Sequence, residues 1–246
     1  MSKETSIEWT DATWNPVTGC TKVSPGCDHC YAERFAERFR DVPGHYFSQG
    51  FDVVLRPQQL DRPLAWKRPK RIFVNSMSDL FHRAVPDDYI DQVFDIMHRA
   101  DWHIYQILTK RAERMNRHIQ RRALSSPLPA HIWLGVSVEN NTFDWRVNWL
   151  RDTPIHTRFI SVEPMLGPID RVSLRGISWV IVGGESGPHH RSMQIDWVRQ
   201  IRDRCNKDGV AFFFKQWHKA ETGRLLDGRT WDELPNVNSL RVSRSA

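Results

Sequence analysis

The sequence lacks any uninterrupted apolar run long enough to cross a membrane, and it lacks a long linker rich in proline, glycine or serine. Only four of its 246 residues are cysteine. The first residues, MSKETSIEWTD, are polar and charged and do not resemble a secretory signal. These features argue against a membrane-embedded chain and against a disulfide-stapled secreted scaffold. We therefore expect a single domain over residues 1–246, located in the reducing cytoplasm and without a membrane partner.

Positive charge exceeds negative charge, with 35 Lys and Arg against 29 Asp and Glu, which gives a formal net charge of +6. A basic surface suits an anionic partner such as a nucleic acid or a nucleotide. The competing interpretation is an arginine-rich composition scattered over a solvated surface. The most regular basic stripe follows one predicted helix and is more often a solvated face than a nucleic-acid track; it comprises Arg111, Arg114, Arg117, Arg121 and Arg122.

Three of the four cysteines lie within residues 19–31, GCTKVSPGCDHCY, in the pattern C-x6-C-x2-C. They are Cys20, Cys27 and Cys30. Three soft thiolates on one short loop indicate an iron–sulfur or metal site with one position left open. Because the loop contains a Pro-Gly pair, its backbone can fold around such a centre.

A structural zinc ion is the alternative metal, since zinc prefers four ligands and His29 or His45 could complete the set. The fourth cysteine, Cys205, lies far away in a helical pattern and is expected to be a buried free thiol. We favour the iron–sulfur interpretation because three thiolates on one loop are a familiar cluster pattern.

From residue 71 onwards, apolar runs alternate with amphipathic helical patterns. Strands are predicted at 71–77, 103–109, 131–138, 158–162, 178–182 and 210–215, with helices between them. This rhythm predicts an α/β fold with a parallel sheet wound right-handedly, as a partial or nearly closed TIM-like (β/α) barrel of six or seven strands. A flat doubly wound sheet is the alternative.

Both ends of the chain differ from this rhythm. Residues 1–12 are expected to be a polar lead-in, followed by a short strand at 13–19, a helix at 31–40 and a second short strand at 51–56. Near the other end, an Asp-Gly pair between apolar flanks predicts a small β-hairpin appendage over residues 220–235.

Polar side chains follow almost every predicted strand. Parallel strands bring their carboxyl ends to one edge, so we expect these side chains to converge on one site. Cofactor binding is assigned to Ser76, Ser78, Asp79, Ser137, Glu139, Gly183, Gly184 and Glu185. Catalysis is assigned to Glu163, Lys110 and Lys215, with the lysines binding a carboxylate or phosphate or delivering a proton. The competing interpretation is that each strand simply ends in a solvated polar residue.

Several stretches together resemble one family. They are the cysteine loop and the segments SIEWTDATWNP, VNSMSDLF, LTKR, GVSVEN, SVEPMLGP, VIVGGESG and FFFKQW with LDGRTWDE. The chain resembles the phage- and prophage-encoded three-cysteine-motif family of unknown function from about residue 6 to residue 235. That family is similar to radical S-adenosylmethionine enzymes.

The resemblance implies that Cys20, Cys27 and Cys30 hold a [4Fe–4S] cluster whose open iron binds S-adenosylmethionine. It also implies an electron donor, because reductive cleavage of that cofactor produces the radical. Two features depart from the pattern: the first cysteine gap is six residues instead of three, and Gly-Gly-Glu follows a late strand. The predicted function is an iron–sulfur enzyme of this type acting on a nucleic acid or nucleotide. The alternative is a non-catalytic, metal-stapled nucleic-acid-binding protein.

Overall fold

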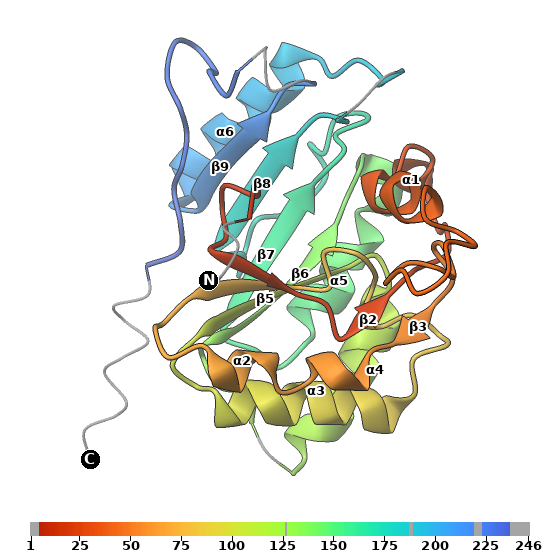
Figure 1. Ribbon diagram of the computed structural model, residues 1–246. Helices are drawn as coiled ribbons and strands as arrows, with labels where there is room; N and C mark the ends of the chain where they lie inside the picture. Colours follow the sequence, from red (N-terminus) through yellow and green to blue (C-terminus); the bar gives the residue numbers. More distant parts are fainter. Residues whose placement is uncertain (1–4, 126, 187–188, 219–222, 237–246) are drawn as a thin grey trace.

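Seven parallel strands form one sheet in the computed structural model, which describes residues 5–125, 127–186, 189–218 and 223–236. Their order is β1 (Ala12–Trp14), β4 (Arg71–Val74), β5 (Ile104–Thr109), β6 (Ile132–Ser137), β7 (Thr157–Val162), β8 (Trp179–Gly183) and β9 (Ala211–Gln216). The sheet curls into a half-barrel (Figure 1). The predicted α/β class and partial barrel are therefore confirmed, and the sheet is not flat.

Helices connect most of the successive strands and lie outside the curled sheet, whereas the connection from β7 to β8 has no helix (Figure 1). They are α2 (Arg62–Ala65), α3 (Asp87–Arg99), α4 (Ala112–Ala123), α5 (Trp145–Arg151) and α6 (Ile195–Asp208). Helix α3 begins with two aspartates, which suit the positive end of the helix dipole. Helix α6 ends at Gly209, whose φ of 67° favours glycine. In the described part of the chain, no helix is both long and apolar enough to cross a bilayer.

The two faces of the sheet build two cores, because successive side chains of a strand point to opposite sides. The outer face packs against the helices. The inner face carries a separate cluster made mainly of aromatic side chains: Trp9, Phe73, Trp133, Phe159, Trp179, Ile181 and Phe213. Trp9 comes from the predicted polar lead-in, yet it is buried and packs edge-on against Phe73 at a centroid distance of 4.6 Å. The lead-in prediction was wrong there, because Trp9 covers the open side of the half-barrel.

Two short strands stand apart from the main sheet. The predicted strand at 13–19 is split, and its second part, β2 (Val17–Thr18), pairs antiparallel with β3 (Val54–Leu55). Between them lie the cysteine loop and helix α1 (Tyr31–Glu37). The segment between β1 and β4 therefore leaves the main sheet after β1, contains the three cysteines, and rejoins the sheet at β4.

A tight turn follows β9 at Asp227 and Gly228, whose φ values are 52° and 80°. Leu226 and Arg229 exchange backbone hydrogen bonds across it. The next residues run beside β9, where the amide of Phe214 donates to the carbonyl of Trp231 at 2.8 Å. Residues 220–222 of the predicted appendage lie outside the described residues.

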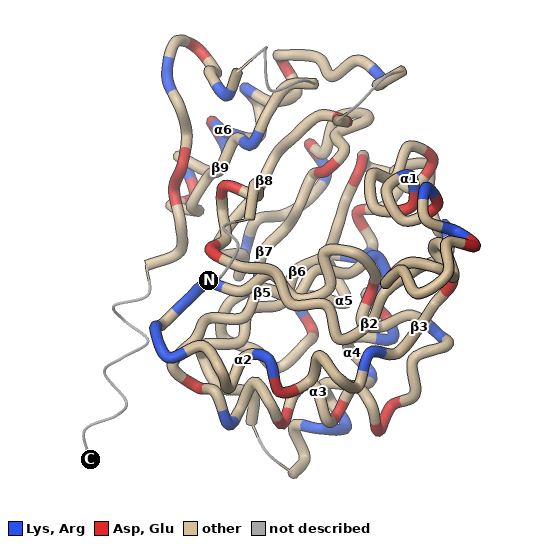
Figure 2. The backbone as a smooth tube through the Cα atoms, viewed as in Figure 1, with Lys and Arg blue, Asp and Glu red and all other residues tan. Residues whose placement is uncertain are grey.

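The arginine stripe of α4 is mostly engaged within the protein. Arg114, Arg121 and Arg122 pair with Asp87, Asp91 and Asp95 of α3 at 2.7, 2.9 and 2.5 Å. Acidic and basic residues accordingly lie together around these two helices (Figure 2). The stripe is thus an interhelical ion-pair network, and its charge is largely neutralised.

Candidate functional site

A pocket of about 460 Å³ opens at the carboxyl ends of the strands, next to the cysteine loop. Trp9 and Phe73 of the inner aromatic cluster form part of its wall. Most of the residues assigned from the sequence line it: Cys20, Cys27, Cys30, Ser76, Ser78, Asp79, Lys110, Ser137, Glu163, Gly184, Glu185 and Lys215. Glu139 and Gly183 are not among its lining residues. Side chains from distant parts of the sequence therefore meet at one place.

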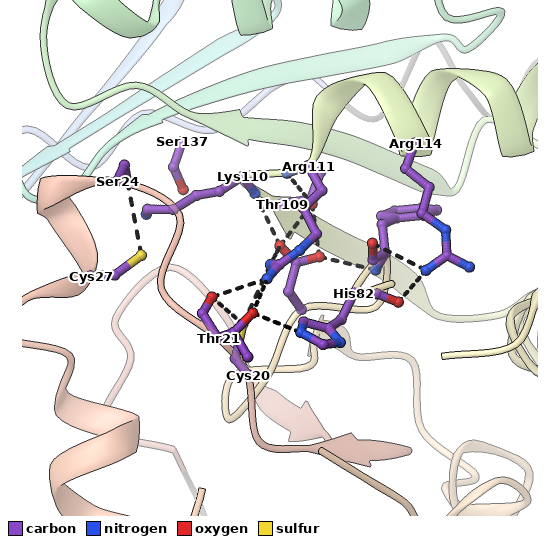
Figure 3. A network of polar contacts seen from close by, with 12 residues as sticks. Cys20, Thr21, Ser24, Cys27, His82, Thr109, Lys110, Arg111, Arg114 and Ser137 are labelled. Carbon is purple, nitrogen blue, oxygen red and sulfur yellow. Dashed lines mark hydrogen bonds and ion pairs between the residues drawn. The ribbon is translucent and has the colours of Figure 1, made fainter. Parts of the chain in front are cut away.

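Cys20 belongs to a polar network around Arg111 (Figure 3). Arg111 Nη1 donates to Asp79 Oδ2 at 2.9 Å and to Cys20 Sγ at 3.4 Å. Thr109 Oγ1 donates to Asp79 Oδ1 at 2.8 Å. Burial raises the pKa of Cys20 to about 11, and the nearby negative charge of Asp79 adds to this, although Arg111 opposes it. The Asp79 carboxylate thus holds Arg111 against the thiol.

Glu139 lies beneath the cysteine loop and is fully buried. Ser24 Oγ donates to its Oε1 at 2.5 Å, and Arg146 Nη1 donates to its Oε2 at 2.8 Å. Lys110 Nζ is 3.4 Å from its Oε1. Gly26 lies so close that an added Cβ would come within 2.5 Å of Oε1, so only glycine fits. Glu139 therefore anchors the loop from below, contrary to the expectation that it faces the pocket.

Glu163 and Lys215 form an ion pair on the pocket wall, with Oε1 and Nζ 3.0 Å apart. Ser161 Oγ donates to the other carboxylate oxygen at 3.1 Å. Ser161 and Glu163 are two positions apart, and both lie on the pocket side. Gly183 packs behind this pair, because an added Cβ there would come within 2.9 Å of Glu163 Oε1.

Glu185 links the end of β8 to the cysteine loop. Its Oε2 lies 3.1 Å from His29 Nδ1 and accepts from the backbone amide of Arg191 at 2.8 Å. Arg191 Nη2 also donates to the carbonyl of Pro25 at 2.7 Å. Burial alone would raise the pKa of Glu185, but the hydrogen bonds from Arg191 and His29 outweigh it and hold that pKa below its usual value. The late Gly-Gly-Glu segment therefore reaches the cysteine site.

The lowered pKa of Glu185 gives a pH-dependent contribution to stability. The contribution is present above the ordinary pKa of 4.5 and is lost as pH falls through the lower folded-state value. We expect Glu185→Gln to lower the free energy of unfolding by about 1–3 kcal/mol near neutral pH, since it removes charge-assisted hydrogen bonds. Denaturant titrations of both proteins at decreasing pH should show this difference shrinking in the acid range. A difference that stays constant down to about pH 3 would contradict this role.

Four functional residues escaped the sequence assignment: Ser24, Arg111, Arg146 and Arg191. Arg111 directly follows the strand end at Lys110, so the rule applied to the other strand ends would have found it. Arg191 lies six positions beyond Glu185 in irregular chain, and no sequence pattern marks it.

Three thiols line the pocket, and thiols are the ligand type that iron–sulfur clusters use. Within the described residues, no group of three or more His, Cys, Asp or Glu side chains is arranged around a single metal ion. In a cluster each thiolate binds a different iron, so its ligands need not surround one ion. Arg111 and Ser24 lie within hydrogen-bonding distance of Cys20 and Cys27, at 3.4 and 3.9 Å, as groups that tune cluster sulfurs do.

The candidate fourth ligands for zinc have other partners. His29 contacts Glu185, and the ring of His45 stacks on Phe39 with a centroid distance of 3.8 Å. His29 nevertheless lines the pocket beside the cysteines.

Comparison with known proteins places the chain in one family. The model of a family described as "Protein of unknown function (DUF5131)" matches residues 4–235. No curated protein and no solved structure matches the chain.

Proposed function

Since the chain belongs to the DUF5131 family of unknown function, we propose its activity from the site itself: it is an iron–sulfur enzyme of radical S-adenosylmethionine type. In this proposal the half-barrel serves as the TIM-like partial barrel of such an enzyme. The observation that carries the proposal is that Cys20, Cys27 and Cys30 line one pocket together with the strand-end acids and lysines. The phage association inferred from the sequence motifs belongs to the same proposal.

The three cysteines would hold a [4Fe–4S] cluster, and the cluster would supply an electron for reductive cleavage of S-adenosylmethionine. Arg111 places positive charge against the thiolate of Cys20, which favours its deprotonated form. Asp79 fixes the guanidinium through a hydrogen bond of 2.9 Å. Asp79 is therefore a positioning residue for the first cysteine.

The opposite wall of the pocket supplies polar groups for the cofactor and the substrate. Glu163 and Lys215 present an acceptor and a cation side by side, 3.0 Å apart. Such a pair can bind an amine and a carboxylate, or hold and return a proton. Trp9 and Phe73 limit water on the inner side, which strengthens these polar interactions.

The substrate class we propose is a nucleic acid or nucleotide, which the net charge of +6 supports. An electron donor is required as a partner. The alternative function is a non-catalytic nucleic-acid-binding protein, in which a metal only shapes the cysteine loop.

The test is to purify the full chain without oxygen and to measure its iron, sulfide and zinc content and its visible spectrum. We expect about four irons per chain and a broad absorbance that changes when S-adenosylmethionine is added. Reductant-dependent cleavage of S-adenosylmethionine should follow. Stoichiometric zinc without colour, even after reconstitution with iron and sulfide, would overturn the proposal and favour the alternative.

A further inference from the structure

The outward face of α1 carries aromatic and basic side chains. Tyr31, Arg34, Phe35 and Arg38 follow the spacing i, i+3, i+4 and i+7, which places them on one side of the helix. Ala32 and Ala36 are buried against the protein instead. As whole residues, Tyr31 and Phe35 are 45% and 44% exposed, although aromatic residues usually face a core. The helix therefore presents an aromatic face to its surroundings.

This face forms a hollow that adjoins the main pocket. The hollow has a volume of about 330 Å³ and is lined by Tyr31, Arg34, Phe35, Arg38 and Met77. Tyr31 also lines the main pocket, so the two spaces meet at its ring. The Tyr31 hydroxyl donates to the carbonyl of Ser76 at 2.6 Å, which fixes the ring at this junction.

No acidic side chain among the described residues forms an ion pair with the two arginines of the hollow. Arg34 and Arg38 are exposed, and neither forms an ion pair there. By contrast, Arg40 pairs with Glu37 at 2.6 Å, and the arginines of α4 pair with α3. The hollow therefore combines two exposed aromatic residues with two arginines that form no ion pair among the described residues, which suits an anionic partner.

We propose that the α1 face binds single-stranded nucleic acid and leads one of its nucleotides into the pocket. The arginines contact backbone phosphates, and bases stack on Tyr31 and Phe35. A single strand fits better than a duplex, because only unpaired bases offer their faces to aromatic rings. The rings line a concave hollow, which a strand can enter and a flat bilayer surface cannot. The inference deepens the proposed function, since it names the polymer that delivers the substrate.

The test measures binding of a labelled single strand of about 16 nucleotides to the full chain by fluorescence anisotropy over a range of salt concentrations. We expect Arg34→Gln/Arg38→Gln to weaken binding about ten-fold and to reduce the slope of log K against log salt by about 1.4. Tyr31→Ala should weaken binding by a similar factor, whereas Tyr31→Phe keeps the ring and should bind nearly as tightly as the unchanged protein.

The matched control is Lys67→Gln/Arg68→Gln, which removes the same charge from exposed residues that precede β4, at the amino end of that strand. It should change the affinity by less than about two-fold. Equal losses in both double variants, equal affinity for a duplex, or binding only to anionic vesicles would overturn the inference. Iron content is measured on the same samples. Specific binding without a cluster would refute only the proposed enzyme, and a cluster without specific binding would refute only this inference.

Discussion

Replacing Cys27 with alanine should abolish iron and sulfide binding and all reductive cleavage of S-adenosylmethionine. Cys27 lies in the middle of the motif and lines the pocket beside Cys20 and Cys30. Two remaining thiolates hold a [4Fe–4S] cluster poorly, because such clusters are bound through several cysteines at once. The measurement is iron and sulfide per chain after anaerobic purification and reconstitution, followed by product analysis.

Cys205→Ala is the matched control for this experiment. Cys205 is fully buried in α6 and is not among the pocket-lining residues. Burial raises the pKa of its thiol to about 12, as is usual for a structural thiol in a protein core. We expect this variant to keep its full iron content. Equal iron in the Cys27→Ala and unchanged proteins would contradict the assignment of the motif as the ligand set.

Replacing Glu139 with alanine should lower the free energy of unfolding by about 3–5 kcal/mol, the cost typical of breaking a buried ion pair. Arg146 is almost completely buried and would lose its carboxylate partner. Ser24 would lose its acceptor at the same time, and the cysteine loop would lose its anchor. Guanidinium or urea titrations at neutral pH measure the change.

A surface ion pair provides the comparison. Glu113 pairs with Arg117 on the exposed side of α4, and Glu113→Ala should cost less than about 0.5 kcal/mol. The double variant Glu139→Leu/Arg146→Met should recover much of the stability, because it also removes the buried guanidinium of Arg146 that Glu139→Ala leaves unpaired. A loss below about 1 kcal/mol for Glu139→Ala would show that Arg146 is stabilised without it.

The half-barrel followed from the sequence because its strands and helices have strong local patterns. The apolar run at 71–77 and the amphipathic segment at 86–99 lie where β4 and α3 lie. The packing of Trp9 over the inner face was missed, because a single aromatic residue in a polar segment carries no periodic signal. Its position depends on the curl of the whole sheet, which is a property of all seven strands together.

The position of the candidate site could be predicted from the sequence, but the hydrogen bonds and ion pairs among its side chains could not. Parallel strands fix their carboxyl ends at one edge, so Glu163 and Lys215 were expected to converge. Which partner each acid takes depends on side-chain packing between segments far apart in the sequence. Glu139 thus turned out to hold Arg146 beneath the loop, and Asp79 to hold Arg111 against Cys20.

The cysteine loop is held by residues that are synthesised much later, so the loop cannot be fully supported until those residues have been made. Ser24 binds Glu139, which lies 115 positions later, and the carbonyl of Pro25 binds Arg191, which lies 166 positions later. Because a chain leaves the ribosome from its N-terminus, the three thiols emerge long before the groups that support their loop. The loop therefore gains all of these supports only after the chain has been made through Arg191, and a fragment ending before Arg191 would carry the motif without them.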